Sequence, residues 1–367
     1  MAFFSLFIGG VVGVKSASNA LFLSHGNSAR FLPALYVLSA GAVAFGSYLL
    51  ARPLARYSSY SVGRLVLRGS AIVLLLLALG SLAGLPGADA LLYISGETYT
   101  TLLSILFWGT FSEVFDLRTS KKVVGIIGAA GMAGSVVGGI LVEHGSRGID
   151  PAYQVVVAAL VLIAAQPLFR LIGRVDAGTI VPRKTGGKAR INAGLHYARA
   201  ERYPKLLGAL VVGLSLLSAL VDFLFRSAIA AKEDAEGMNA IFGAYNADAG
   251  MIALVFQLFL SRYLLARMGL FPFLMLIPIA VAISAAAAIG WSDSSTPLYV
   301  LKVVQSVGSF SVTAAAVALL YNPIPAPIRG SLRALLDGLT DQLHRDFLGV
   351  AGDQVAVGGF KNQGVVV

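Results

Sequence analysis

The sequence is dominated by ten runs of about 20 mostly apolar residues, and no other feature limits its possible folds as strongly. An α-helix rises about 1.5 Å per residue, so about 20 residues cross the roughly 30 Å hydrocarbon core of a bilayer. Backbone inside lipid must satisfy its own hydrogen bonds, and the runs are continuous rather than alternating, which favours helices over barrel strands. The predicted spans are Phe3–Leu23, Phe31–Ala51, Val66–Gly84, Ala90–Phe111, Val123–Val142, Ala152–Ile172, Leu206–Phe225, Asn239–Leu260, Phe271–Trp291 and Leu298–Tyr321.

The amino-acid composition excludes most soluble classes of protein. Hydrophobic residues make up 57% of the chain and charged residues 13%, whereas roughly 25% of the residues in an ordinary soluble domain are charged. So few charges cannot cover a globule of 367 residues with polar surface, which excludes a cytosolic enzyme, a DNA-binding protein and a disordered chain. The chain has no cysteine, so disulfides and thiolate metal sites are excluded as well. We therefore expect an all-α polytopic membrane protein.

The formal net charge of +10 is concentrated in the predicted loops. Sixteen Lys and Arg residues lie in the connections after the second, fourth, sixth and eighth spans, and three lie in the connections on the opposite side. Cytoplasmic loops of membrane proteins carry the excess of Lys and Arg. We therefore predict a multi-pass protein of the cell membrane, the inner membrane of a bacterium, with a cytoplasmic amino terminus and no nucleic-acid partner. The opening residues lack the features of a signal peptide.

The longest polar connection divides the predicted spans into six and four. We place an N-terminal half at residues 1–173, a basic cytoplasmic linker at 174–205 and a C-terminal half at 206–367. This order is typical of transporters that are built from two six-helix repeats. The second half ends in a polar tail after four spans, so we expect a six-plus-six architecture that is truncated to about ten transmembrane helices.

We single out six of the polar or ionisable residues that lie in the predicted spans or directly beside them, where such residues are costly unless they are paired or functional. They are Lys15 and Asn19 in the first span, Glu97 in the fourth, Asp222 and Arg226 in the seventh, and Lys302 in the tenth. Lys15 and Asn19 lie one turn apart on one face of a helix, as do Asp222 and Arg226. We interpret the six as substrate-binding residues.

Each of these residues also has a purely structural interpretation. Lys15 and Lys302 could extend their ammonium groups to the membrane surface. Glu97 could make a hydrogen bond to a neighbouring helix. Asp222 and Arg226, at positions i and i+4, could neutralise each other.

A second charged group marks the end of the fourth span and the start of the fifth. Its members are Glu113, Asp116, Arg118, Lys121 and Lys122. Charges here could latch the cytoplasmic side in one state and release it in the other, as alternating access requires. The excess of positive charge in cytoplasmic loops also explains part of the group. We predict a gate at this position.

The fifth span carries a glycine stripe, Gly128, Gly131, Gly134 and Gly138. Small residues at this spacing let two membrane helices approach closely, so we predict a helix-packing role. The four histidines show no metal-ligand spacing, and no serine–histidine–acid set stands out. We therefore expect no metal, no cofactor and no enzyme activity.

Four stretches, in the same order along the chain, resemble the ATP:ADP antiporter (nucleotide transporter) family of bacteria and plastids, which is related to the major facilitator fold. They are Asn19–Leu23 with Phe31–Pro33, Leu102–Gly139, Asp222–Arg226, and Leu320–Pro325 with Arg329 and Asp337. The chain is most similar to the relatives in free-living bacteria, whose role is unassigned. It departs from the nucleotide exchangers at the Lys-Asp pair of their first helix, where it has Ser18 and Asn19.

The resemblance implies a major facilitator-type transporter whose halves rock about a site lined by the first, fourth, seventh and tenth spans. Its partners would be the lipid bilayer and a small-molecule substrate, with a nucleotide as the implied cargo. The three candidate cations Lys15, Arg226 and Lys302, with two acids nearby, favour an anionic or zwitterionic solute rather than ATP in particular. Two alternatives remain: a proton-coupled facilitator for another small solute, with Glu97 or Asp222 as the coupling acid, and a non-transporting membrane platform. We expect a monomer.

Overall fold

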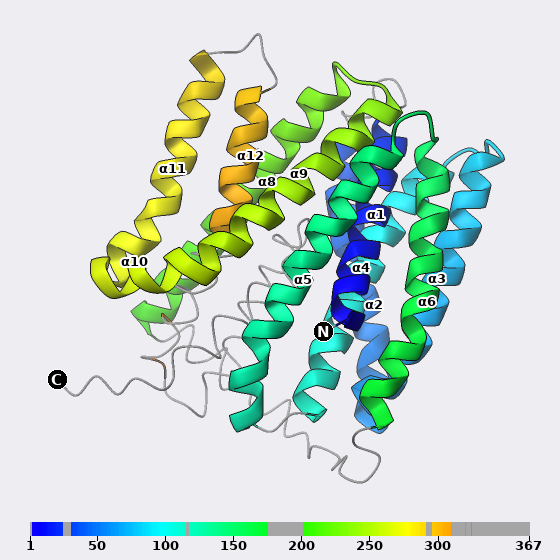
Figure 1. Cartoon of the computed structure of the whole chain (residues 1–367), viewed down its shortest axis with the longest axis horizontal. Helices are drawn as coiled ribbons and strands as arrows, with labels where there is room; N and C mark the ends of the chain where they lie inside the picture. Colours follow the sequence, from blue (N-terminus) through cyan, green and yellow to red (C-terminus); the bar gives the residue numbers. More distant parts are fainter. Residues whose placement is uncertain are drawn as a thin grey trace.

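The computed structural model of the chain describes residues 2–24, 31–114, 117–174, 201–290 and 296–309, together with residues 320 and 324. Every regular element in these residues is helical (Figure 1). A π-helical turn, η2 (Phe256–Leu260), joins α9 to α10. The α-helices are α1 (Ala2–Leu23), α2 (Leu32–Arg56), α3 (Ser59–Leu82), α4 (Ala88–Val114), α5 (Leu117–Gly145), α6 (Pro151–Arg174), α8 (Arg202–Ala230), α9 (Ala235–Val255), α10 (Ser261–Met268), α11 (Leu270–Gly290) and α12 (Thr296–Gly308).

The expected all-helical membrane fold is confirmed, since each predicted span falls on a helix. Within the described residues, eight helices are long and apolar enough to cross a membrane, and the apolar part of α2, Ala34–Leu50, is shorter. The tenth predicted span begins on α12, and its last part falls outside the described residues. Most of the predicted linker and of the polar tail lies outside them too.

Local sequence signals account for several helix ends. The Asp234 side chain accepts a hydrogen bond from the Gly237 N–H at 2.8 Å and so caps the start of α9. We predicted a loop between the eighth and ninth spans, but the chain forms the short helix α10 there instead. Gly269, with φ of 79°, separates α10 from α11, because glycine reaches this backbone conformation without strain.

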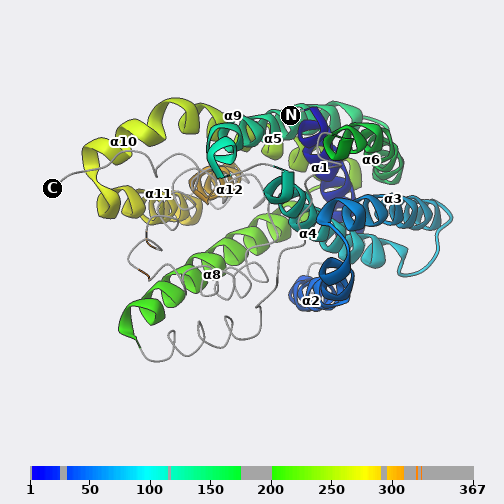
Figure 2. The same ribbon diagram turned by 90° about the horizontal axis from the view of Figure 1, so that it is seen from below.

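Helix α1 lies at the centre of the bundle. In the most apolar stretch of α1, 83% of the residues are buried inside the protein. In the corresponding stretch of α11, at the periphery, 22% are buried. Figure 2 shows α1 enclosed by neighbouring helices, and it packs against α4, α5, α6 and α9. A helix that carries polar residues inside a membrane is expected to be buried among other helices in this way. Large apolar side chains such as Val37 and Ile289 instead point outward, as a lipid-facing surface requires.

Helices α5 and α9 form the most extensive contact between the N-terminal helices α1–α6 and the C-terminal helices α8–α12 (Figure 1). Glycine makes this close approach possible. A Cβ atom added at Gly139 of α5 would lie 2.5 Å from the Ala247 nitrogen of α9, and one added at Gly243 would lie 2.5 Å from the Glu143 nitrogen. Any larger residue at either position would push the two backbones apart.

The glycine stripe of α5 faces α1. A Cβ at Gly134 would overlap the backbone of Ser5, and one at Gly138 would lie 2.7 Å from the Gly9 Cα. A Cβ at Gly131 would meet the Phe4 ring at 2.5 Å. Gly128 is buried in the same helix. These contacts hold α1 in a fixed register against α5. That register sets the position of the polar residues of α1 along the bundle axis.

Candidate substrate site

The six polar residues singled out in the spans lie together in one buried network. It is formed by α1, α4, α8 and α12, with tyrosines added from α2, α4 and α9. The network lies toward the end of the bundle where α1 ends and α2 begins, which is the predicted outer side. Buried charges in a protein must be paired, and here the three cations of the network, Lys15, Arg226 and Lys302, each have a carboxylate partner.

Lys15 of α1 and Glu97 of α4 form the first ion pair. Their Nζ and Oε2 atoms are 2.6 Å apart, and both side chains are almost fully buried. Gly96 lets the two helices approach, since a Cβ there would lie 3.2 Å from the Val14 side chain. Lys15 therefore does not extend to the membrane surface, and that structural interpretation is wrong for this residue.

Asp222 of α8 is the centre of the second charged group. Its Oδ2 atom lies 2.8 Å from the Arg226 Nε and accepts a hydrogen bond from the Tyr36 hydroxyl at 2.9 Å. Its Oδ1 atom lies 2.9 Å from the Lys302 Nζ. Arg226 and Lys302 both have 0% exposure. Lys302 is thus not a lysine that reaches the membrane surface, and Asp222 and Arg226 do not form an isolated pair.

Arg226 connects the two groups of helices. Its Nη1 atom donates hydrogen bonds to the Asn19 Oδ1 of α1 at 2.9 Å and to the Tyr93 hydroxyl of α4 at 2.8 Å. Its guanidinium carbon also lies 5.6 Å and 5.7 Å from the ring centroids of Tyr93 and Tyr36. A planar cation with five donors is suited to such a position because it can bond in several directions at once.

A second layer of polar side chains surrounds Lys302. Its Nζ lies 5.7 Å from the centroid of the Tyr245 ring, and the Tyr245 hydroxyl bonds Ser306 at 2.5 Å. The side-chain amide of Gln305, the residue before Ser306, donates a hydrogen bond to the Ser218 hydroxyl of α8 at 2.9 Å. These bonds fix α12 against α8 and α9 and hold the Lys302 ammonium in place.

The sequence interpretation did not assign Tyr36, Tyr93, Tyr245 and Ser306 to the site. A tyrosine inside a membrane span is a usable signal, because a buried phenol normally finds a hydrogen-bond partner. Which tyrosine meets which charge depends on how helices far apart in sequence pack.

The side chains of the predicted cytoplasmic gate lie outside the part of the chain that the structure describes. Asp116 lies outside the described residues. Glu113 ends α4, and Arg118, Lys121 and Lys122 open α5, but only their backbone is described. Among the described residues no group of His, Asp or Glu could hold a metal ion.

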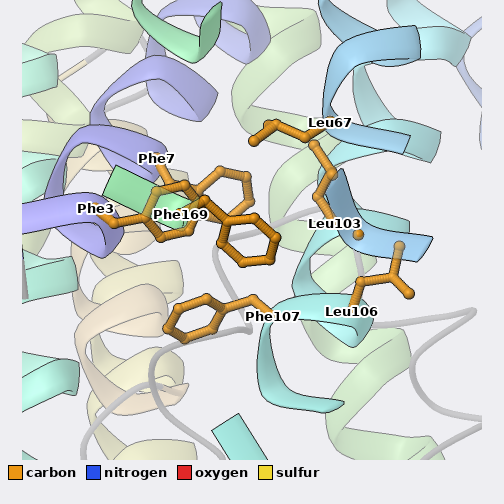
Figure 3. A pocket seen from close by; sticks show the side chains of 8 residues that line it. Phe3, Phe7, Leu67, Leu103, Leu106, Phe107 and Phe169 are labelled. Atoms are coloured by element: carbon orange, nitrogen blue, oxygen red, sulfur yellow. The ribbon is translucent and has the colours of Figure 1, made fainter. Parts of the chain in front are cut away.

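A small apolar pocket lies near the opposite end of α1 from the charged network (Figure 3). Its volume of about 10 Å³ leaves room for about one water molecule. The pocket is therefore a packing defect between aromatic rings rather than a solute site. It is lined by Phe3, Phe7, Gly63, Leu67, Leu103, Leu106, Phe107 and Phe169.

These features define an all-helical membrane fold of the major facilitator type, with a charged network buried between its two groups of helices. The solved structure of a point mutant of the nucleoside transporter NupG is similar, with a TM-score of 0.61 at 16% identity, covering 96% of this chain and 90% of that chain. A second NupG structure has a TM-score of 0.54 at 16% identity, covering 97% and 94%.

A POT family transporter in complex with a thioalcohol-conjugated peptide is similar as well. Its TM-score is 0.63 at 11% identity, and the match covers 97% of this chain and 92% of that chain. No family profile and no curated protein sequence matches the chain. At identities this low the solved structures show the fold alone.

Proposed function

We propose that the protein is a membrane transporter that moves a small anionic or zwitterionic solute by alternating access. The observation that carries this proposal is the buried network of five charged side chains that joins α1 and α4 to α8 and α12. Burying charges is costly, and well-packed apolar residues would often hold helices together as well or better. A network of this kind is therefore expected where a polar solute must replace its internal partners.

The charge of the network favours a solute with few negative charges. The three cations Lys15, Arg226 and Lys302 face the two carboxylates Glu97 and Asp222, which leaves one net positive charge. A nucleotide brings roughly three or four negative charges, and burying them would need more cations than this. ADP, the cargo that the family resemblance implies, is therefore a compound to test, and a solute with one carboxylate or phosphate group suits the site better. The peptide in the POT family structure is an example of a solute that a similar fold binds.

In this proposal the halves at residues 1–173 and 206–367 rock about the network, which lies in the bilayer with the amino terminus in the cytoplasm. The charges from Glu113 to Lys122 would gate the cytoplasmic side. The protein would work as a monomer.

Binding is tested most simply by thermal unfolding of the purified protein in detergent. The compounds are ADP, inorganic phosphate, lactate, alanine and uridine, each at several concentrations. A compound at 100 times its Kd stabilises the folded state by about 2.7 kcal/mol. We expect stabilisation by an anionic or zwitterionic compound, and its loss in Lys302→Gln.

The matched control is Arg64→Gln, which removes an exposed arginine of α3 far from the network. It should leave ligand stabilisation unchanged. If no anionic or zwitterionic compound stabilises the wild-type protein, or if both variants lose the effect equally, the proposal fails. A protein that no solute stabilises is what a non-transporting platform predicts.

A further inference from the structure

Helices α3 and α6 pack against each other at one edge of the bundle (Figure 2). Much of their apolar surface is left uncovered by the protein. In the most apolar stretch of α3 28% of the residues are buried, and in that of α6 39% are buried. Side chains left exposed in this way within a membrane span lie against the acyl chains of the bilayer.

Two arginines interrupt this lipid-facing surface. Arg64 is exposed and Arg68 is half-buried, and both lie inside the apolar span Tyr60–Leu82 of α3. The Arg68 Nε donates a hydrogen bond to the Gln166 Oε1 of α6 at 3.1 Å. The guanidinium carbon of Arg64 lies 5.9 Å from the centroid of the Tyr60 ring. Neither arginine has an ion-pair partner among the described residues, although a cation within a membrane span is costly unless it is paired.

The sequences of the two helices supply no acid that could pair with these arginines. Neither α3 nor α6 contains Asp or Glu, and residues 1–88 contain none at all. The contacts of Arg68 with Gln166 and of Tyr60 with Phe169 show that α3 and α6 run antiparallel. On α6, Arg170 follows Gln166 by one helical turn, toward the end of the bundle where Arg64 lies. Positive charge is therefore concentrated at this end of the two helices.

Beyond the arginines the same surface becomes apolar. Residues that follow Arg68 at helical spacing on α3 are exposed and apolar, namely Ile72, Leu76 and Leu79. On α6, Ile163 lies one turn before Gln166 and is exposed as well. The helix rises about 16 Å from Arg68 to Leu79, which is about half of the roughly 30 Å hydrocarbon core and therefore the depth of one leaflet.

We propose that this face of α3 and α6 binds an anionic phospholipid from the leaflet on the predicted cytoplasmic side. The phosphate group pairs with Arg64 and Arg68, whose planar guanidinium groups match the oxygen geometry of phosphate. The acyl chains lie along Ile72, Leu76 and Leu79. One phospholipid thus supplies both things that the face lacks, an anion beside the arginines and an apolar cover beyond them.

Charge complementarity selects a lipid with a net negative charge. The headgroup of a zwitterionic lipid carries its own cation, which would lie close to the two arginines and oppose binding. The site is on the outer surface of the N-terminal helices and is separate from the charged network, so the lipid is not the transported solute. Solute binding therefore does not depend on Arg64, and the lipid site does not rest on the transport function.

Native mass spectrometry of the full chain, released from detergent micelles, counts the bound lipids and measures their Kd. The probe is phosphatidylglycerol, and phosphatidylcholine with the same acyl chains is the comparison. We expect wild type to bind phosphatidylglycerol more tightly. A cation beside an anionic headgroup contributes about fivefold in affinity, so Arg64→Gln and Arg68→Gln should each weaken phosphatidylglycerol binding about fivefold, and the double variant about 25-fold.

The matched control is the double variant Arg202→Gln with Lys205→Gln. It removes two exposed cations at the start of α8, on the same predicted side of the membrane but away from α3 and α6. It should keep the affinity of wild type. An equal loss in both double variants would mean that the lipid responds only to the total positive charge, and this result overturns the proposal. Equal affinity of wild type for the two lipids overturns it as well.

Glycerol 3-phosphate distinguishes a lipid from a soluble phosphate ester, because it carries the phosphate without acyl chains. We expect a large excess of it to leave phosphatidylglycerol bound, since the apolar part of the face contributes to binding. Displacement by glycerol 3-phosphate would contradict the assignment to a lipid. If Arg68→Gln does not fold, the exposed Arg64→Gln still tests the site, and an unchanged affinity in that variant overturns the proposal.

Discussion

Removing one partner or both partners of the Lys15–Glu97 pair tests whether this pair serves function rather than stability. Lys15→Met leaves the Glu97 carboxylate buried without its cation, and Glu97→Met leaves the Lys15 ammonium without its anion. Breaking a buried ion pair in this way costs about 3–5 kcal/mol, whereas replacing both partners by apolar residues of similar size is often neutral or stabilising by about 1–4 kcal/mol. We therefore expect both single variants to be much less stable than the double variant, and the double variant to be at least as stable as wild type.

The assay is thermal unfolding in detergent, with solute stabilisation measured on the same samples. The control is Arg68→Met, whose half-buried side chain bonds Gln166 at 3.1 Å and has no ion-pair partner among the described residues, so its cost should be about 1 kcal/mol. The double variant should be stable and yet bind no solute. Single variants as stable as wild type, or a double variant that loses as much as either single one, would refute the reasoning.

Three further outcomes follow from individual contacts. Gly134→Val should prevent folding, because its Cβ would overlap the Ser5 backbone. Gly41→Ala is the control: a Cβ at Gly41 would have no atom within 4 Å, so the free energy of unfolding should change by less than about 1 kcal/mol. Expression levels and thermal unfolding of the two variants test this difference. Tyr93→Phe removes a hydroxyl that accepts from Arg226 and should cost about 1.5–3 kcal/mol of unfolding free energy, and an unchanged melting curve would contradict the contact. Asn239→Leu should stabilise by about 1–2 kcal/mol, since its buried amide has no hydrogen-bond partner among the described residues, and a loss of stability would reveal a bond to another group.

The helices could be predicted from the sequence because lipid imposes one rule on every span. Backbone in hydrocarbon must form its own hydrogen bonds, so a run of about 20 apolar residues has to be helical. The helix α10 escaped prediction because Ser261–Met268 is short and amphipathic, and that rule does not apply to it.

The presence of a polar site could be predicted for a similar physical reason. Which of its residues pair with one another could not be predicted. A charge inside a span has to be paired or functional, which was enough to single out Lys302 and Asp222. That these two pair with each other depends on α12 packing against α8, across 80 residues of sequence. The part played by Tyr36, which joins α2 to this pair, likewise needs the packed helices.

Uptake into proteoliposomes tests the central claim most directly. Labelled ADP, phosphate, lactate, alanine and uridine are offered with and without a proton gradient, to wild type, Arg226→Gln and the exposed-surface control Arg64→Gln. We predict that an anionic or zwitterionic compound enters above the level of protein-free liposomes, that the control keeps this flux and that Arg226→Gln loses it. Flux of none of these compounds, or full flux in Arg226→Gln, would contradict a transporter that works through the buried network.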